Sequence, residues 1–452
     1  MNQAVILAGG QGKRMKAPIP KPMFKVLGEP MLEWVLSACE AAELSRTVTG
    51  YESNQIEAYL GDRCRTVFQA ERLGTGHAVM QTIPFLSEDT SGSTLVLCGD
   101  APFIDSRTIA DSLLRHTKEK NAVTVITATV EQPFGYGRIL RTDSGIAGIV
   151  EEKDATDEQR KITEINSGCY WFRTADLIQL LGKITNDNKQ QEYYLTDTIA
   201  IALQDGLRAG AFCSKNPNVV LGANDRKGLL KLNTAARMAV LEQHMDNGVG
   251  FCCTDGIIIE RHVEIGAGTE ILPGTIIRGN SRIGCNCTIG PNCIIENTVI
   301  GDNSVLNSVQ AYDSVIDSDV KIGPFVHIRP GSHIASNTLI GDFVEIKNSE
   351  IGANTAISHL AYVGDSNVGE YVNIGCGCAT VNFDGIKKSR CEIGDHAFIG
   401  CNTNLIAPVS LGTYAYTAAG TTVTADVPDY ALAIDRGTLN IRDGYSKKKF
   451  ET

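Results

Sequence analysis

The hydrophobic and polar positions follow two different patterns along the chain. Up to about residue 225, short apolar and β-branched runs alternate with stretches in which apolar residues recur at helical spacing. The runs typical of buried strands are residues 4–8, 95–98, 123–130 and 146–151. The helical stretches include residues 30–41 and 106–120. This alternation predicts an α/β domain with a largely parallel sheet.

From about residue 255 an aliphatic residue followed by glycine recurs, at many spacings of 6, 12 or 18 residues. A six-residue period gives one short strand per repeat, with the aliphatic side chain inward and Gly or Asn at a corner, where positive φ costs little. Three such strands close a triangular coil. The pattern therefore predicts a parallel β-helix of hexapeptide repeats rather than a glycine-rich β-sandwich. The repeated glycines are Gly266, Gly284, Gly290, Gly301, Gly323, Gly341, Gly352, Gly364, Gly375, Gly394, Gly400 and Gly412.

Residues 225–245 separate the two patterns and have the spacing of one helix. The helix is expected to begin near Asp225 and to end at Asn247-Gly248, which are ordinary start and stop signals. We therefore expect three segments: a domain at residues 1–225, a linker helix at 226–248 and the β-helix at 249–452.

Composition narrows the class of protein. The formal net charge of -11 and the pI of about 5.3 argue against a general nucleic-acid-binding protein, which usually carries a basic surface. No secretory signal and no apolar segment of transmembrane length is visible, so no membrane insertion is expected. The 14 cysteines then indicate reduced thiols in a cytoplasmic protein. Cys252-Cys253 and Cys376-Gly-Cys378 are spaced too closely for the usual zinc pattern.

The stretch VILAGGQGKRM, residues 5–15, ends a predicted strand in a glycine-rich turn that can direct backbone N–H groups at phosphate. It lacks the Walker A pattern and the third glycine of the dinucleotide fingerprint, and taken alone a tight βα turn explains it equally well. The cations Lys13, Arg14 and Lys21 favour a phosphate site. Asp100 follows the strand at 95–98, where an open α/β sheet binds ligands, although Asp also suits a helix N-cap.

Polar residues also interrupt the β-helix repeats. Arg329 and Lys347 are 18 residues apart, one full coil, and should stack on one face. Two stacked cations repel each other unless an anion lies between them, so a phosphate is expected there. His359 interrupts the repeat beside this pair, and imidazole is the side chain that most often serves as a general base.

Seven segments, in order, carry a resemblance to a known fold: LAGGQGKRM, QAERLGTGHAV, GDAPF, FGYGRI, GIVEEKDATDEQRKITEINSGCY, EYYLTD and GANDR. They resemble the sugar-nucleotide pyrophosphorylases, and with the hexapeptide repeats the likeness extends over essentially the whole chain. It is greatest to the bifunctional N-acetylglucosamine-1-phosphate uridylyltransferase/glucosamine-1-phosphate N-acetyltransferase family. The resemblance implies a Rossmann-like nucleotidyltransferase domain followed by a left-handed parallel β-helix, and a homotrimer with the acetyl site shared between chains.

That family makes UDP-N-acetylglucosamine, a bacterial cell-wall precursor. The resemblance implies acetyl transfer from acetyl-CoA to glucosamine 1-phosphate in the C-terminal half, then uridylyl transfer from UTP to N-acetylglucosamine 1-phosphate in the N-terminal half, with release of pyrophosphate. Arg14 and Lys21 would neutralise phosphates, and Asp100 and Asn224 would bind Mg²⁺. The positions that match nucleotide and sugar contacts are Leu7, Ala8, Gly9, Gly10, Gln69, Gly74, Thr75, Gly137, Glu151, Asn166 and Asn224.

In the second half the resemblance makes His359 the base for the 2-amino group of the acceptor. The acceptor-binding positions are Arg329, Lys347, Tyr362, Asn373 and Lys388. The acetyl-CoA-binding positions are Cys376, Asn382, Phe383, Cys401, Ala419 and Arg436. Three of these depart from the family: Phe383 stands where Tyr is typical, and Cys376 and Cys401 stand where Ala and Ser are usual.

Two alternatives stay open. One is a sugar-1-phosphate nucleotidyltransferase for a different sugar or nucleotide, with a non-catalytic β-helix; Glu151, Asn166 and His359 together favour the bifunctional enzyme over it. The other is a non-enzymatic regulatory protein on the same frame. That reading predicts a degenerate metal site, whereas Asp100 and Asn224 are both present.

Overall fold

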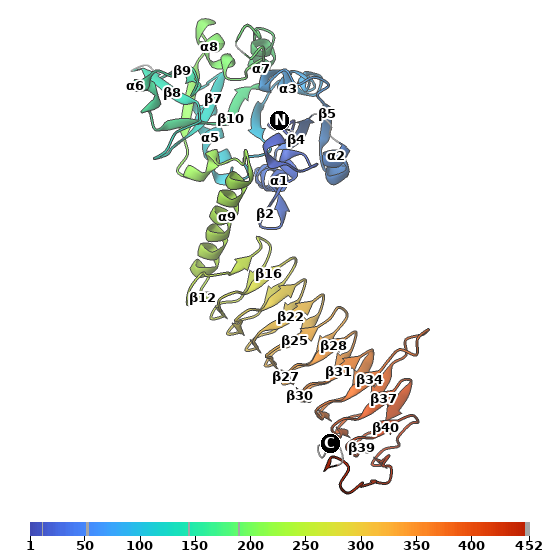
Figure 1. Ribbon diagram of the computed structural model, residues 1–452. Coiled ribbons are helices and arrows are strands. Elements are labelled where there is room, and N and C mark those ends of the chain that lie inside the picture. The colour runs from blue at the N-terminus through green and yellow to red at the C-terminus, as the bar shows by residue number, and fades with distance from the viewer. Residues whose placement is uncertain (11, 51–53, 143–144, 189, 448–452) are drawn as a thin grey trace. The chain divides into compact units, whose positions relative to one another are not determined.

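The computed structural model describes residues 1–10, 12–50, 54–142, 145–188 and 190–447. The chain divides into two compact units, Met1–Ala236 and Arg237–Thr452. The first contains an α/β sheet with helices, and the second a stack of short strands (Figure 1). The sequence patterns predicted an α/β domain followed by a stack of short strands, and the two units have these structures.

The described residues of the first unit form a nine-stranded sheet with the order β11-β7-β10-β6-β1-β4-β5, and the hairpin β8–β9 joins it at β10. The strands are β1 (Gln3–Leu7), β4 (Ser45–Gly50), β5 (Arg65–Phe68), β6 (Ser93–Cys98), β7 (Val123–Thr129), β8 (Arg138–Thr142), β9 (Gly145–Val150), β10 (Glu164–Arg173) and β11 (Ala209–Cys213). The four strands expected from the sequence are β1, β6, β7 and β9, each within two residues of its predicted ends. The short strands β2 (Lys25–Val26) and β3 (Glu29–Pro30) pair separately.

Six of the seven strands on the main path of the sheet run in one direction, as the expected largely parallel sheet requires, but the sheet is mixed. Strands β4 and β6 flank β1 in parallel, but β10 runs antiparallel to both β6 and β7, and β8 and β9 form an antiparallel hairpin. The one-turn helix α6 (Asp157–Arg160) lies between β9 and β10 in the chain. The sequence analysis did not identify β10, whose first half, Glu164–Gly168, is largely polar.

Helices cover both faces of this sheet. Buried residues of α1 (Met31–Ala41), α2 (Asn54–Leu60) and α5 (Ser106–Lys118) pack with Ile6 and Leu97 on one face. Residues of α3 (Thr75–Met80), α7 (Thr174–Leu181) and α8 (Asp197–Gln204) pack with Val5 and Val96 on the other. Alternate residues of β1 and β6 therefore serve opposite cores, which is why both strands are apolar throughout. The remaining short helix is α4 (Ile83–Leu86).

The second unit consists of three parallel sheets whose neighbouring strands are one coil apart. The first sheet contains β12 (Gly250–Phe251), β15 (Glu270–Ile271), β18 (Thr288–Ile289), β21 (Val305–Leu306), β24 (Lys321–Ile322), β27 (Leu339–Asp342), β30 (Ala356–His359), β33 (Asn373–Ile374), β36 (Phe398–Ile399), β39 (Tyr416–Thr417) and β41 (Leu432–Ala433). The second contains β13 (Ile258–Ile259), β16 (Ile276–Arg278), β19 (Ile294–Glu296), β22 (Val309–Tyr312), β25 (Val326–Ile328), β28 (Glu345–Lys347), β31 (Tyr362–Gly364), β34 (Ala379–Val381), β37 (Asn404–Ile406) and β40 (Thr422–Val423). The third contains β14 (Glu264–Ile265), β17 (Arg282–Ile283), β20 (Val299–Ile300), β23 (Val315–Ile316), β26 (His333–Ile334), β29 (Glu350–Ile351), β32 (Ser366–Val368), β35 (Cys391–Ile393) and β38 (Val409–Leu411).

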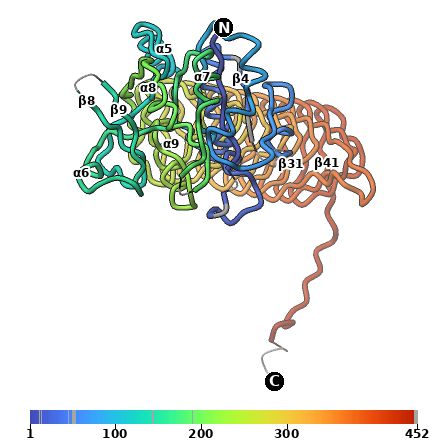
Figure 2. Tube along the Cα trace, turned by 90° about the horizontal axis from the view of Figure 1, so that it is seen from above, coloured from blue at the N-terminus to red at the C-terminus, as the bar shows by residue number. Residues whose placement is uncertain are grey.

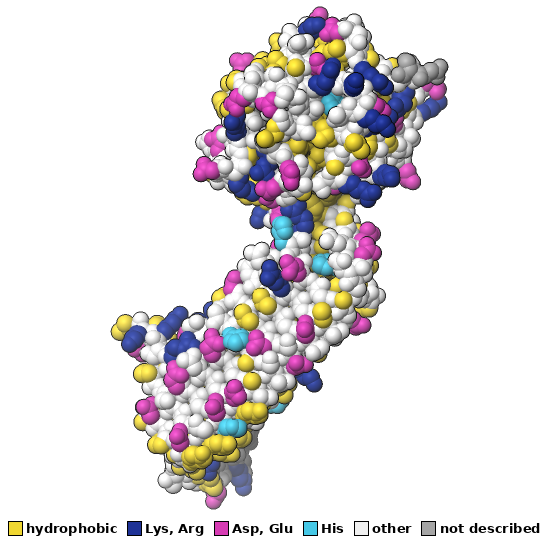
Figure 3. All heavy atoms as spheres, turned by 180° about the vertical axis from the view of Figure 1, so that it is seen from behind, with side chains coloured by type: hydrophobic (Ala, Val, Ile, Leu, Met, Phe, Trp, Pro, Cys, Tyr) yellow, Lys and Arg dark blue, Asp and Glu magenta, His cyan; other side chains and the backbone are white. Residues whose placement is uncertain are grey.

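The predicted hexapeptide β-helix is confirmed by its inward columns. In the second sheet Ile328, Ile346 and Val363 occupy the same register in successive coils and are buried. Outward positions carry polar groups, and acidic, basic and histidine side chains are interspersed on the visible face of the stack (Figure 3). Each coil thus buries its aliphatic residues against the coils above and below it.

Corners of the β-helix use left-handed backbone at asparagines, as predicted, but most of the repeated glycines do not take this role. Asn286 and Asn303, for example, have φ values of 56° and 59°. Of the twelve repeated glycines only Gly290 and Gly323 have positive φ. At most of the others a Cβ would collide with the adjacent coil, as at Gly341, where it would lie 1.8 Å from the Ser358 carbonyl oxygen.

In the last coils, aromatic side chains hold one left-handed corner instead. The ring of His396 stacks between those of Tyr371 and Tyr414, with centroids 5.0 and 4.5 Å away. Ring stacking offsets part of the steric cost of left-handed backbone at a bulky residue.

The helix expected between the two patterns is α9 (Arg226–Asp246). At its start the Asp225 carboxylate accepts a hydrogen bond from Gly228 N–H at 2.8 Å, and it ends before Gly248, whose φ is 87°. Its residues up to Ala236 belong to the first unit and the rest to the second. In the part of the chain that the structure describes, no helix is both long enough and apolar enough to cross a membrane.

His333 of β26 lies between carboxylates of the adjacent coils, with Nε2 3.2 Å from Asp317 and Nδ1 2.9 Å from Glu350. Burial alone would lower the pKa of His333, but the two hydrogen-bonded carboxylates outweigh it and raise that pKa above its usual value. The protonated form therefore stabilises the folded state, fully below the unfolded pKa of about 6.5, and this stabilisation disappears as the pH rises through the folded value.

We predict that the urea midpoint of the wild type, relative to that of His333→Gln, falls when the pH is raised from about 5.5 to about 8.5. The Asp317→Asn variant keeps only Glu350 beside the ring. Its urea midpoint, relative to that of His333→Gln, should therefore fall less over the same pH range than the wild-type midpoint does. Equal pH dependence of the urea midpoint in wild type and His333→Gln would contradict the prediction.

Two candidate active sites

The glycine-rich turn after β1 is folded back by backbone hydrogen bonds. The carbonyl oxygen of Gly12 accepts from Met15 N–H at 2.7 Å, and that of Gly10 accepts from Lys21 N–H at 3.0 Å. Gly12 has a φ of 59°, and a Cβ at Gly10 would lie 3.5 Å from the Lys21 side chain. Because β1 and β6 are parallel neighbours, the turn stands at their shared carboxyl edge with Lys21 held against it.

Two cavities, with volumes of about 300 and 380 Å³, open at this edge and share Leu7, Thr75, Cys98 and Glu192 in their walls. The smaller cavity is lined by further residues with predicted nucleotide or metal contacts, namely Gly9, Gly10, Gln69, Gly74 and Asp100. The larger is lined by two with predicted sugar contacts, Glu151 and Asn166. The fold thus brings most predicted positions of the first half to two adjoining spaces, each large enough for part of a sugar nucleotide.

The second glycine-rich turn is held against the segment around Tyr193. The N–H of Tyr193 donates to the Leu73 carbonyl at 2.7 Å, and the N–H of Gly76 donates to the Tyr193 carbonyl at 2.8 Å. Gly74 has a φ of 105°, and a Cβ there would lie 2.6 Å from the Tyr193 carbonyl oxygen, so only glycine fits. Gln69 is 4% exposed and its amide donates to the Gly74 carbonyl at 3.4 Å, which fixes its orientation at the cavity wall.

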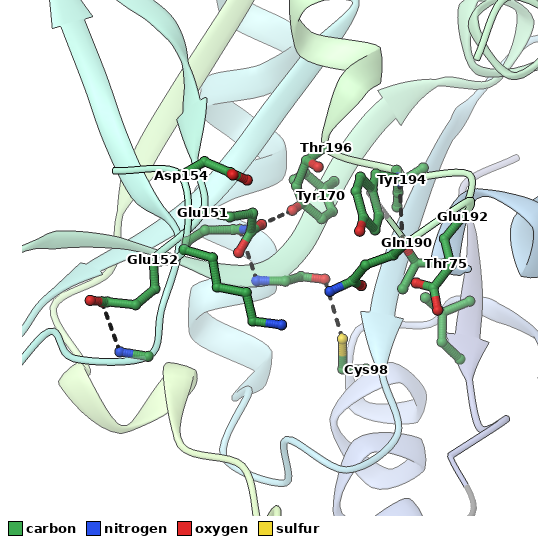
Figure 4. Close-up of a pocket in the computed structure, with 16 residues that line it drawn as sticks. Thr75, Cys98, Glu151, Glu152, Asp154, Tyr170, Gln190, Glu192, Tyr194 and Thr196 are labelled. Atoms are coloured by element: carbon green, nitrogen blue, oxygen red, sulfur yellow. Dashed lines mark hydrogen bonds between the residues drawn. The ribbon is translucent and has the colours of Figure 1, made fainter. Parts of the chain in front are cut away.

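Acidic and amide groups line the larger cavity. Figure 4 shows Glu151, Glu152 and Asp154 on one side of it, and Gln190 and Tyr194 on the opposite side. Desolvation by the surrounding protein, together with the nearby Asp154 carboxylate, raises the pKa of Glu151. Carboxylates and amides that converge on a cavity of this size suit a ligand with several hydroxyl groups.

Hydrogen bonds fix Asn166 from both ends of its amide. Its Nδ2 donates to the Tyr170 hydroxyl at 2.6 Å, and its Oδ1 accepts from Gly168 N–H at 2.9 Å. Its backbone N–H donates to the carbonyl of Gly137, a buried glycine at which a Cβ would lie 3.0 Å from Ile149. Tyr170 is therefore a positioning residue that the sequence analysis did not identify.

The Lys21 ammonium connects the two predicted metal ligands. Its Nζ lies 2.7 Å from Asn224 Oδ1 and forms an ion pair with the Asp100 carboxylate. Oxygen atoms from two distant segments thus converge on one cationic position. A pair of protein oxygens beside a phosphate-sized cavity suits Mg²⁺, which completes its octahedron with phosphate oxygens and water.

The remaining predicted residues of the first half have other surroundings. Ala8 is buried in the core below the turn. Arg14 is exposed on the short 3-10 helix Lys13–Met15, and the side chain of Lys13 lies outside the described part of the structure. The segment 190–196 lines both cavities, although sequence reasoning gave its residues no role. Its one signal in the sequence is the EYYLTD motif, and its hydrogen bonds to the turn at Gly74 explain why the two segments belong together.

One corner of the β-helix carries a row of outward-facing residues, one from each of five successive coils, and His359 is among them. In successive coils the left-handed corner residues are Phe343, Leu360, Gly377, Asn402 and Gly420, all with positive φ. The residues that precede them share one outward position, which we call the corner row: Asp342, His359, Cys376, Cys401 and Ala419. Four predicted positions of the second half, one catalytic and three CoA-binding, are thus brought together as neighbours.

Asp342 is the member of this row that sequence reasoning missed. It pairs with His359 in the β27–β30 register, and its Oδ1 lies 3.0 Å from Nδ1 of the imidazole. The hydrogen bond from His359 lowers the pKa of Asp342, so the carboxylate stays charged beside the ring. A 17-residue spacing between Asp and His is the only signal in the sequence, and it becomes meaningful once the coil length is known.

The cations of the second sheet are paired with carboxylates. Arg329 is one coil from Lys347, as predicted, but its Nη1 lies 2.9 Å from Glu345. Lys347 Nζ lies 2.8 Å from Asp365, which raises the pKa of Lys347. The argument that stacked cations require an anion between them therefore does not hold, because each already has a carboxylate partner.

Asp365 organises the rest of this group. It is 4% exposed, and although burial would raise its pKa, hydrogen bonds from Asn348, Lys347 and Asn382 lower it. Asn382 also donates to the Tyr362 hydroxyl at 3.3 Å. The buried carboxylate thus holds Lys347, Asn348 and Asn382 directly, and the Tyr362 hydroxyl through Asn382.

The other predicted positions lie around these two groups. Asn373 is exposed on β33, and Phe383 is exposed and forms a β-bridge with Lys388 in the loop at 381–390. Arg436 follows β41 in an exposed segment that leaves the coils (Figure 2). Arg436 is therefore a predicted CoA contact outside the corner row, as are Asn382 and Phe383.

Comparisons with known proteins agree with this two-part design. A family model for nucleotidyl transferases matches residues 3–217, and one for six bacterial transferase hexapeptide repeats matches residues 313–348. The bifunctional protein GlmU of Acetivibrio thermocellus is 45% identical over 449 residues, 99% of this chain and 97% of that protein. Bifunctional GlmU proteins of Caldanaerobacter subterraneus subsp. tengcongensis and Streptococcus agalactiae serotype V are 45% and 41% identical over 451 residues, 99% of this chain and 98% of each.

We predict that Gly74→Ala destabilises the first unit by about 2 kcal/mol or more, because the new Cβ both clashes with the Tyr193 backbone and strains a left-handed residue. Gly61→Ala is the matched control, since Gly61 also has a positive φ but nothing lies within 4 Å of its Cβ position. Urea unfolding measures how much free energy of unfolding each variant loses relative to the wild type. Equal free energies of unfolding would mean that contact with Tyr193 does not constrain the turn.

Proposed function

The chain belongs to the family of bifunctional GlmU proteins, and we propose that it makes UDP-N-acetylglucosamine by two successive transfers. The β-helix transfers an acetyl group from acetyl-CoA to glucosamine 1-phosphate. The N-terminal unit then transfers uridylyl from UTP to N-acetylglucosamine 1-phosphate and releases pyrophosphate. One observation carries the proposal: the same chain has a charged cavity at a glycine-rich turn and a histidine–aspartate pair on a β-helix corner.

Uridylyl transfer joins two anions, so charge neutralisation and positioning are the main requirements. An oxygen of the sugar 1-phosphate attacks the α-phosphorus of UTP, and the bond to pyrophosphate breaks. The nucleophile is already ionised and needs no base. Lys21 and Arg14 neutralise phosphate charge, the turn at Gly9 and Gly10 admits the nucleotide close to the backbone, and Gln69 reads the base edge.

Asp100 and Asn224 are the residues that would hold Mg²⁺ in this unit. Their oxygens already converge on one cation, the Lys21 ammonium, and that donor set fits the ion. When bound, Mg²⁺ adds positive charge beside the phosphates. Lys21 would then be released from its carboxylate partner to contact phosphate oxygen.

The sugar side of the same unit selects the acceptor. Glu151 and Asn166 face the larger cavity, and Tyr170 and Gly168 hold the Asn166 amide in one orientation. We assign these two side chains to sugar hydroxyl and N-acetyl groups. A sugar that lacks the matching groups would leave buried polar atoms unpaired, which is the physical basis of discrimination.

Acetyl transfer uses His359 as the general base. With Nδ1–H donated to Asp342, the lone pair of Nε2 is free to accept a proton from the 2-amino group as that nitrogen attacks the thioester carbonyl. The CoA sulfur then leaves. Arg329, Lys347, Tyr362, Asn373 and Lys388 bind the acceptor phosphate and sugar, and the corner row from Cys376 to Ala419, with Asn382, Phe383 and Arg436, binds acetyl-CoA.

Assembly and location complete the proposal. We assign a cytoplasmic homotrimer. The free cysteines support the location, and the exposed segment with Arg436 is available for contact with a neighbouring copy. We also assign residues 1–225 to uridylyl transfer, 249–452 to acetyl transfer and 226–248 to a linker helix.

We predict that one purified sample releases pyrophosphate from UTP, Mg²⁺ and N-acetylglucosamine 1-phosphate, and free CoA from acetyl-CoA and glucosamine 1-phosphate. His359→Ala should lower the rate of CoA release by about 100-fold or more and leave pyrophosphate release unchanged. Pyrophosphate release without CoA release in the wild type would instead favour a nucleotidyltransferase with a non-catalytic β-helix.

Asp342→Asn should lower kcat for CoA release by about tenfold or more, with little change in KM for glucosamine 1-phosphate, because Asp342 orients the base and does not touch the acceptor. The matched control is Asp317→Asn, which removes another carboxylate beside a histidine, on a different sheet. If both variants lose kcat equally, the role of Asp342 in orienting His359 is disproved.

A further inference from the structure

The corner row contains two cysteines in adjacent coils. The backbone N–H of Asn402 donates to the carbonyl of Cys376 at 2.7 Å, and in a parallel ladder this bond places Cys376 opposite Cys401. Both thiols are free and exposed. The neighbouring residues keep the same register between the two coils. Ile374 is opposite Ile399 before the pair, and Gly377 packs against Asn402 after it.

This register brings the Cα atoms of the two cysteines within the range that a disulfide spans. Neighbouring strands lie about 4.8 Å apart, and disulfides join Cα atoms separated by about 4.4–6.8 Å. The two cysteines share the same outward position before a left-handed residue, Gly377 in one coil and Asn402 in the next, so their side chains leave the corner on the same side.

A third thiol nearby is excluded from this pairing. Cys378 is 5% exposed, and its Sγ donates to the Gly400 carbonyl at 3.0 Å. Burial raises the pKa of the Cys378 thiol, so it remains protonated and unreactive. The exposed pair is therefore distinct from the inward-facing cysteine beside it.

We propose that Cys376 and Cys401 form a disulfide within the chain when a peroxide is present, and that this bond closes the acetyl-donor site. The bond itself follows from the register. Its effect on acetyl transfer rests on the proposed function, which assigns the corner row to acetyl-CoA.

The chemistry is a two-electron oxidation by hydrogen peroxide. One thiolate attacks a peroxide oxygen, the O–O bond breaks, and a sulfenic acid and water form. The second thiolate then attacks the sulfenic sulfur, so that the S–S bond forms, the S–O bond breaks and a second water leaves. Two thiols lose two protons and two electrons in total, and a dithiol such as dithiothreitol reverses the reaction by exchange.

The position of the bond explains its effect. Cys376 follows His359 by one coil in the corner row, and Cys401 follows by two. A disulfide ties these two side chains together across the surface along which the donor thioester must reach His359. The N-terminal site contains neither residue, so pyrophosphate release provides an internal control.

The test uses the full-length wild type, treated with hydrogen peroxide and then freed of oxidant. Peptide mapping by mass spectrometry, with free thiols alkylated before digestion, should identify one Cys376–Cys401 cross-link within a chain. CoA release should fall by about tenfold or more, pyrophosphate release should not change, and dithiothreitol should restore CoA release. Affinity for CoA, measured by calorimetry, should fall with the cross-link.

Cys376→Ala and Cys401→Ser should each prevent the cross-link, and each variant is compared with its own reduced activity, since both residues lie in the assigned donor site. Cys285→Ser is the control for a generally exposed thiol of the β-helix, and it should respond to peroxide as the wild type does.

Absence of the cross-link, or a cross-link only between chains, overturns the proposal. A cross-link that leaves both CoA affinity and CoA release unchanged overturns the closure of the donor site. If the reduced wild type releases no CoA from glucosamine 1-phosphate, the proposed acetyl transfer fails, while the peptide map still decides whether the disulfide forms.

Discussion

Parallel backbone register is the constraint on which both candidate sites depend. In the first unit the neighbouring parallel strands β1 and β6 end at one edge, which places the turn at Gly10 beside Asp100. In the β-helix the main-chain ladder repeats every coil, so any residue before a left-handed corner is stacked on its counterparts. Side chains far apart in the sequence become neighbours because their backbones must pair.

Several charged groups in the two sites share a second feature, because a carboxylate holds each of them. Lys21 contacts Asp100, Lys347 contacts Asp365, and His359 contacts Asp342. A held side chain loses less conformational freedom when substrate binds. In the proposed function a phosphate competes with the carboxylate for each lysine, so binding is an exchange of partners. For the histidine, the carboxylate fixes which ring nitrogen is available.

Sequence reasoning predicted the two architectures and most of the candidate positions. It missed β10, the one strand on the main path of the first sheet that runs against its neighbours, because polar residues interrupt the apolar pattern in the first half of that strand. It also treated Arg329 and Lys347 as an unneutralised pair. Their partners, Glu345 and Asp365, lie at spacings of 16 and 18 residues, which become contacts only when the coil closes.

The sequence by itself determined the repeat, the glycine-rich turns and the residue types present, because hydrophobic period and backbone conformation are local properties of the chain. The tertiary structure alone decided which polar groups meet. The convergence of Asp100 and Asn224 on Lys21, and the order of Asp342, His359, Cys376 and Cys401 in one row, depend on how long each connecting loop is. Coil lengths here vary, so a fixed period predicts a β-helix but does not predict its side-chain neighbours.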